Sequence, residues 1–186
     1  MNIFYLHDDP VIAAKAMTDK HVVKMILESA QLLSTAHRFT HGTLYTEKSA
    51  AGRNLKRYRL ADDFLESRLY KATHINHPSA VWVRQSKDNY RWLYDHFLAL
   101  CEEYTARYGK THATQSLLET ALSYIPSLPD VPQTPILLAI ADTKHHVAGN
   151  PIQSYRNYYI AEKLKTAKDV ERFYSVLGPN KVVILE

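Results

Sequence analysis

Residues 19–38 read DKHVVKMILESAQLLSTAHR, and the expected architecture follows from this stretch. It contains no Gly or Pro and is rich in strong helix formers, which predicts one long helix. Thr18 or Asp19 can cap its start, and the pattern ends near Arg38 or Phe39. Apolar residues cover most of its circumference, so the helix should be buried on nearly all sides. We therefore expect a mainly α protein built around this helix.

A narrow polar stripe interrupts that apolar surface. At about 100° per residue, five side chains fall within a band of about 80°: His21, Lys24, Glu28, Gln31 and Thr35. Ionisable groups on a buried helix are costly unless they face a cleft. We expect Glu28 and His21 to line the principal cleft, Glu28 as a general acid or base and His21 as a proton carrier near neutral pH. The alternative is an ordinary surface ion pair between Lys24 and Glu28.

The rest of the chain predicts further helices joined by long loops. Residues 1–6 form an extended segment or a helix start, and we expect burial of Ile3, Phe4 and Leu6 to fix the direction of the N-terminus. Pro10 suits the first position of a short helix. Helices are expected over residues 79–108, ended by Gly109, then over 113–124 and 153–163, with another to Tyr174. Four prolines between residues 126 and 135 exclude regular structure there. Residues 42–75 read as a polar loop followed by a helix over about 59–71.

These elements fit one domain over residues 1–186, with three to five long helices and long loops. Within it we expect 42–75 to be an insertion and 176–186 a C-terminal extension, whose VVILE segment forms a short strand or a docked tail. With 186 residues, of which 46% are hydrophobic, the chain can bury one core and is not disordered.

Composition restricts the function classes. The longest uncharged apolar run, 136–141, is too short to cross a bilayer, and Asp8 and Asp9 interrupt any signal peptide. We expect a cytoplasmic protein without a membrane partner. Seven basic and three acidic residues lie between Lys48 and Lys71. This stretch is either a solvated charged surface or a basic flap over a phosphate-bearing ligand.

Ten histidines raise the question of a metal site. The candidates are His7 with Asp8 and Asp9, His21, His74 with His77, and His145 with His146. Their spacings match no compact ligand motif, and Cys101 is the single cysteine, so we expect no metal and no cofactor.

Three segments carry a resemblance to known proteins: MNIFYLH at the start, DKHVVKMILESAQLL, and NHPSAVWVRQSKDNYRWLYDHFLALCEEYTARYGKTH. They resemble an uncharacterised phage protein family and, more remotely, pyrimidine-dimer DNA glycosylases of the endonuclease V type. In those enzymes the N-terminal amine attacks C1′ of the damaged nucleotide, and a glutamate seven residues after a histidine assists it. His21 and Glu28 have that spacing. Further matches are Glu103, Arg107, Gly109 and an aromatic patch of Tyr155, Tyr158 and Tyr159.

The resemblance implies an endonuclease V-like fold, DNA as the partner, and a base-excision enzyme with abasic-site lyase activity, in the host cytoplasm if phage-encoded. Because Asn2 is bulky, Met1 should be retained and supply the amine, about 4–7 Å from Glu28. The expected DNA-binding residues are Lys20, Lys24, Gln31, His77, Arg84 and Arg156. Two alternatives stay open: a non-catalytic DNA-binding or host-modulating phage protein, and a metal- or base-assisted enzyme acting on nucleotides or modified bases.

Overall fold

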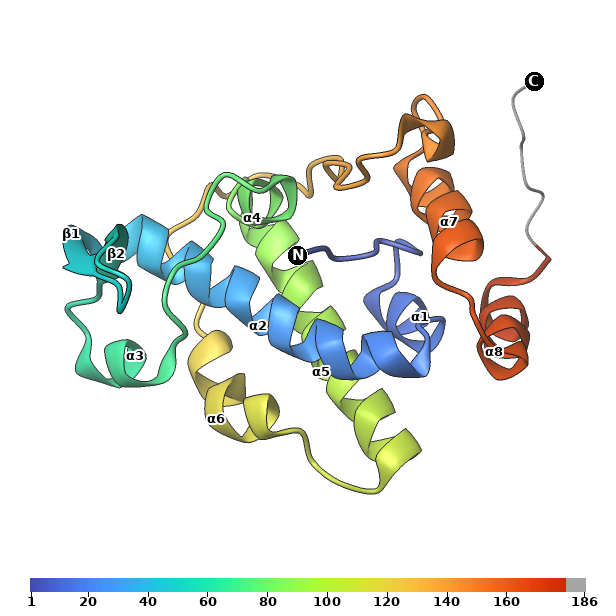
Figure 1. The fold of residues 1–186 in the computed structure, drawn as a ribbon, viewed down its shortest axis with the longest axis horizontal. Coiled ribbons are helices and arrows are strands. Elements are labelled where there is room, and N and C mark those ends of the chain that lie inside the picture. Colours follow the sequence, from blue (N-terminus) through green and yellow to red (C-terminus); the bar gives the residue numbers. More distant parts are fainter. Residues whose placement is uncertain (180–186) are drawn as a thin grey trace.

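Two long helices crossing each other form the centre of the computed structural model, which describes residues 1–179 (Figure 1). They are α2 (Asp19–His41) and α5 (Lys87–Tyr108). The other helices are α1 (Pro10–Lys15), α3 (Asp63–Arg68), α4 (Pro78–Val83), α6 (Ala113–Leu122), α7 (Pro151–Glu162) and α8 (Ala167–Leu177), with a 3₁₀ turn η1 (Thr143–His145). Strands β1 (Thr43–Lys48) and β2 (Asn54–Arg59) form one antiparallel pair. The expected mainly α fold is confirmed, with more helices than expected and a small sheet.

The helix α2 begins where its sequence indicates and ends at His41, two or three residues later than expected. The Thr18 side chain accepts a hydrogen bond from the backbone N–H of His21 and caps the helix. Most of the circumference of α2 is buried, including Val22, Ile26 and Leu33. The main packing partner of α2 is α5, and α1 also packs along α5. Burial of apolar area in this crossing is the principal stabilising term.

The predicted helix over residues 79–108 is divided in two. Pro78 occupies the first turn of α4, which ends at Val83, and α5 starts at Lys87. Between them, Ser86 is extended and its side chain accepts from the N–H of Asn89, so it caps a new helix. The expected end is confirmed, because Gly109 adopts φ 68°, a left-handed conformation that favours glycine.

Residues 42–75 differ most from the expectation. The predicted polar loop is a β-hairpin, in register from Thr43 opposite Arg59 to Lys48 opposite Asn54. The predicted helix over about 59–71 covers only Asp63–Arg68. The strand-forming residues Thr43, Tyr45, Thr46 and Tyr58 flank a turn that contains Gly52 with a positive φ, and this combination favours the hairpin. That 42–75 is an insertion stays a prediction.

The C-terminal third follows the proline-rich loop. No regular helix or strand occurs between α6 and η1. The two helices expected after residue 150 are confirmed as α7 and α8, with shifted ends. The predicted strand or tail at VVILE lies outside the described residues. No helix within residues 1–179 is long and apolar enough to span a membrane.

Candidate active site

The N-terminal segment is buried. Ile3, Phe4, Tyr5 and Leu6 are each at most 6% exposed. The Tyr5 ring stacks on Trp92, with ring centroids 4.3 Å apart. The expectation that apolar side chains fix this segment is therefore confirmed, and the position of the α-amine is set by the core.

The amine of Met1 lies beside Glu28. The Met1 nitrogen is 4.0 Å from Glu28 Oε2, within the expected range. The backbone N–H of Asn2 donates to the same oxygen at 2.9 Å, and Lys24 Nζ is 3.2 Å from Oε1. The Glu28 side chain is only 12% exposed. One carboxylate thus faces two cationic groups and one backbone donor at the end of the chain.

Asn2 shapes the turn that directs Met1 toward Glu28. Its Oδ1 accepts from the N–H groups of Ile3 and Phe4 at 2.8 and 2.9 Å, and its Nδ2 donates to the Ala139 carbonyl at 2.9 Å. Phe4 has φ 53°, a left-handed conformation uncommon for an aromatic residue. This role of Asn2 was not predicted from the sequence, although the tendency of asparagine side chains to bond to nearby backbone groups is a signal for it.

His21 faces the aromatic core. Its Nδ1 lies 2.8 Å from the Tyr159 hydroxyl, and its ring stacks on Phe4 with centroids 4.6 Å apart. Burial, followed by the charges of Lys163 and Lys24, lowers the pKa of His21 to about 4. The ring is therefore neutral at neutral pH, which speaks against the expected proton carrier in that range. A catalytic role for His21 in another form stays a prediction.

His77 lies outside α2, at the start of α4. Its Nδ1 accepts from the Ser79 N–H and caps α4. Burial lowers the pKa of His77, and the positive charge of the Met1 amine lowers it further. Lys20 and Lys24 are exposed and Gln31 is half-buried on α2. The structure thus brings Met1, Lys24 and Glu28 together, whereas DNA binding by Lys20, Gln31 and His77 stays a prediction.

A family model for pyrimidine dimer DNA glycosylases matches residues 1–116. The chain belongs to this family. The match includes α2, the hairpin and α5, and therefore the N-terminus, Glu28 and His77. Membership indicates a DNA glycosylase-type function with DNA as the substrate. Neither the curated proteins nor the solved structures gave a match.

Two other residues of the resemblance, Glu103 and Arg107, hold the glycosylase scaffold together. Arg107 pairs with Glu103 and Asp19 and donates to the carbonyl of Met17. These bonds tie the end of α5 to the turn between α1 and α2. They fix the start of the helix that carries Glu28.

The two arginines expected to bind DNA make internal contacts. Arg84 donates to the Ile75 carbonyl, and its guanidinium lies 4.3 Å from the centre of the Phe39 ring. Arg156 is half-buried and its Nε donates to the Leu6 carbonyl at 2.9 Å. Tyr155 and Tyr159 are fully buried, so core packing is their role. DNA binding by Arg84 and Arg156 stays a prediction.

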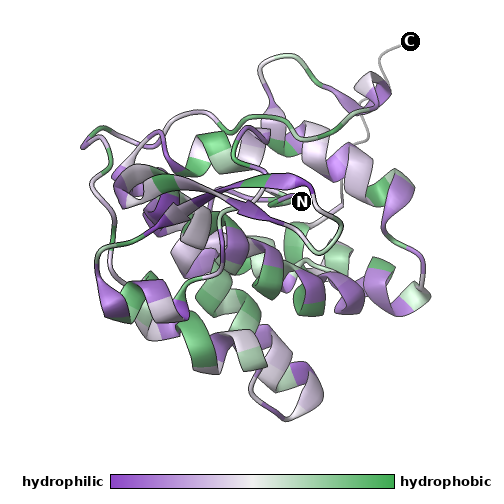
Figure 2. Ribbon diagram, turned by 60° about the vertical axis from the view of Figure 1, so that its left-hand side comes forward, coloured by the Kyte–Doolittle hydropathy of each residue, from purple (hydrophilic) through white to green (hydrophobic). Residues whose placement is uncertain are grey.

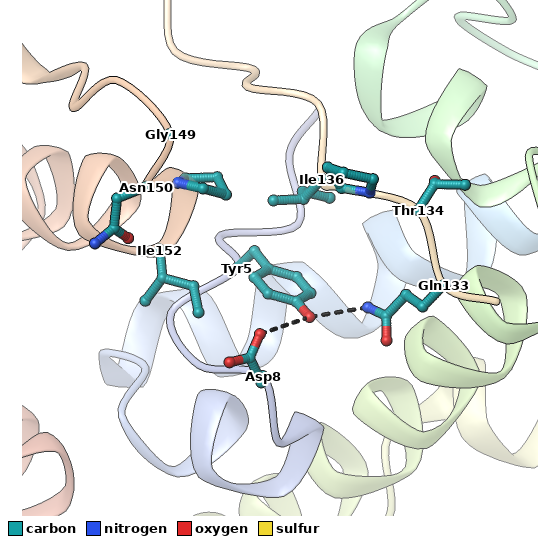
Figure 3. A pocket seen from close by; sticks show the side chains of 10 residues that line it. Tyr5, Asp8, Gln133, Thr134, Ile136, Gly149, Asn150 and Ile152 are labelled. Carbon is teal, nitrogen blue, oxygen red and sulfur yellow. Dashed lines mark hydrogen bonds between the residues drawn. The ribbon is translucent and has the colours of Figure 1, made fainter.

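A pocket of about 460 Å³ lies between the N-terminal segment and the start of α7 (Figure 3). The Tyr5 hydroxyl in it is hydrogen-bonded to Gln133 and Asp8. Neither Glu28 nor His21 lines this pocket, and their expected place in the principal cleft stays a prediction. The backbone of Met1 and Asn2 lies over Glu28 instead.

The metal alternative gains no support from the side chains. Within residues 1–179, no group of three or more His, Cys, Asp or Glu is arranged to hold a metal ion. His7 accepts from the backbone N–H of Asp9, and the His146 ring bonds the Ile140 carbonyl. These histidines serve local structure.

Proposed function

We propose that the protein is a base-excision DNA glycosylase that also cleaves the strand at the resulting abasic site, with the α-amine of Met1 as nucleophile and Glu28 as its partner. The proposal rests on one observation above all: the amine nitrogen and the Glu28 carboxylate are 4.0 Å apart at the end of a buried segment. Family membership supplies the substrate class.

In the proposed reaction, the Met1 nitrogen forms a bond to C1′ of the damaged nucleotide. The glycosidic bond breaks, and its electron pair leaves with the base. Glu28 stabilises the positive charge that develops on the sugar and takes a proton from the nitrogen. Ring opening then gives an imine. Loss of a C2′ proton breaks the C3′–O bond and cuts the strand.

The surroundings of Glu28 suit this role. The Asn2 N–H holds Oε2 in place, so the carboxylate does not have to be reoriented during the reaction. Lys24 Nζ, 65% exposed at its side chain, can contact a phosphate next to the damaged sugar. His77 can contact DNA as a neutral ring, since its pKa is lowered.

Borohydride trapping tests the proposal. The protein is mixed with duplex DNA carrying one abasic site, and borohydride reduces the imine to a stable adduct that is digested and mapped by mass spectrometry. We expect the adduct on the Met1 nitrogen, and its loss when the amine is methylated or acetylated. Lys24 is the internal competitor because its Nζ also lies near Glu28. An adduct on Lys24, or none at all, would refute the proposal.

A further inference from the structure

The segment 42–75 is attached to the face of α2 that carries Glu28. Gln31, Thr35, Arg38 and Gly42 follow Glu28 at alternating steps of three and four residues, which places them in one line along the helix. The Thr35 hydroxyl accepts from the Thr73 N–H, at the far end of the segment. Both ends of the segment therefore lie on the Glu28 side of α2.

The base of the hairpin is held firmly. Arg38 is 3% exposed and pairs with Glu66. Its guanidinium also donates to the carbonyls of Tyr58, Glu66, Leu69 and Tyr70. A Cβ at Gly42 would lie 2.3 Å from the Arg38 carbonyl oxygen and 2.7 Å from Tyr58 Cβ, so the chain passes too close for any other residue. The direction in which the hairpin leaves α2 is fixed.

The outer part of the hairpin is cationic and exposed. Residues 43–59, the hairpin arm, carry five cations and one carboxylate. Glu47 is already paired with Arg57 and Lys71. The exposed Lys48, Arg53 and Lys56 have no ion-pair partner within residues 1–179. Figure 2 brings this end of the molecule forward and shows much of the arm in the hydrophilic colour.

The register places two of these cations together. Thr46 pairs with Lys56 and Lys48 with Asn54, so Lys48 and Lys56 project from the same side of the two-stranded sheet. Their neighbours on that side, Thr46 and Asn54, are also exposed. The outer part of this side is therefore polar and positively charged, while at its base Tyr58 contacts Phe39 of α2, with ring centroids 5.7 Å apart.

The distance to the proposed catalytic groups is set by α2. Glu28 and Gly42 are 14 residues apart, which corresponds to about 21 Å of helix. At about 3.4 Å per base pair, this is about six base pairs of duplex. The arm is more than a Debye length (about 8 Å at physiological salt) from Glu28, so its charges leave the carboxylate unaffected.

We propose that the hairpin arm binds the phosphate backbone of the duplex on one side of the damaged nucleotide, about six base pairs or more away, because the base of the arm is already about 21 Å from Glu28. The position of that nucleotide rests on the function proposed above. Charge complementarity and the fixed base favour duplex DNA, because a rigid cationic arm loses little conformational freedom when it meets a regular array of phosphates. The arm increases the affinity for DNA and contacts the duplex on one side of the damaged nucleotide, while the reaction takes place at Met1 and Glu28.

The test compares two double variants that remove the same charge. Lys48→Gln with Lys56→Gln changes the arm, and Lys15→Gln with Lys110→Gln is the control, at two exposed lysines on other elements. The probe is a labelled 30-base-pair duplex with a central tetrahydrofuran abasic analogue. We expect the arm variant to bind about tenfold or more weakly near 0.1 M salt, and the slope of log K against log[salt] to fall by about 2. The control should retain both values.

Duplexes shortened on one side of the abasic analogue test where the arm binds, with the wild-type protein. Trimming one flank to four base pairs from the analogue should weaken wild-type binding and erase the difference between wild type and arm variant, while trimming the other flank should do neither. Equal effects of the two double variants, or unchanged binding by the arm variant, would overturn the proposal. Borohydride trapping at saturating DNA separates the two hypotheses: the arm variant should trap like wild type. Failure of trapping by wild type would refute only the catalytic proposal.

Discussion

Glu28→Gln is the substitution that tests the catalytic proposal most directly. Glutamine keeps the length and shape of the side chain, and its carbonyl oxygen can still accept from the Asn2 N–H. What it removes is the negative charge beside the Met1 amine. Lys24 loses its partner but is exposed, whereas the Met1 amine is left without a carboxylate beside it. The fold should survive, with a loss of about 1–3 kcal/mol in the free energy of unfolding, because the Asn2 N–H then donates to a neutral acceptor and the amine has no counter-charge.

The expected size of the effect follows from the geometry. The carboxylate is 4.0 Å from the amine that would attack C1′. At about that distance and an effective dielectric constant of about 20, two unit charges interact by about 4 kcal/mol. A cation developing on the sugar at similar range would lose this stabilisation, which corresponds to a rate about 10³-fold lower.

Single-turnover cleavage of a duplex with one pyrimidine dimer measures this loss, and urea unfolding checks the fold. Glu102→Gln is the matched control because Glu102 is exposed on α5. It should cleave at the wild-type rate. If Glu28→Gln retains a rate within tenfold of wild type, electrostatic assistance by Glu28 is not what drives base excision, and the assignment of this residue fails.

Three further predictions follow from the same contacts. Adding one glycine before Met1 converts its amine to an amide and moves the new amine by about 3.8 Å, so trapping should be lost while equilibrium DNA binding persists; undiminished trapping would contradict the proposed nucleophile. Arg38→Ala should lower the free energy of unfolding by about 3–5 kcal/mol in urea, whereas Arg91→Ala, which breaks only an exposed pair, should change it by less than about 1 kcal/mol. Stability should fall as the pH is lowered from about 6.5 to about 4, because the unfolded chain takes up protons that three buried rings with pKa values of about 4 do not take up in the folded protein. A flat profile of urea midpoints across this range would refute the prediction for His21, His37 and His96.

Local signals in the sequence were sufficient to predict the helices on which the site depends. An uninterrupted run of helix formers, a Thr18 cap and the spacing of apolar residues indicated α2, and the same spacing revealed the line of Lys24, Glu28 and Gln31. Pro10 and Gly109 marked ends that the structure confirms. These features act within a few residues, so they can be read without knowing the fold. The apolar start of the chain likewise predicted a buried segment close to Glu28.

Contacts between distant residues decided the rest. His21 is neutral because Phe4 and Tyr159 cover it, and no pattern on α2 reveals those partners. The hairpin arm takes its direction from Arg38 and Gly42, whose contacts lie up to 32 residues away. The 4.0 Å between the Met1 amine and Glu28 likewise results from packing of a buried segment against a helix 26 residues on. Hydrophobic spacing specifies which face of an element is buried, whereas tertiary packing alone determines which polar groups meet there.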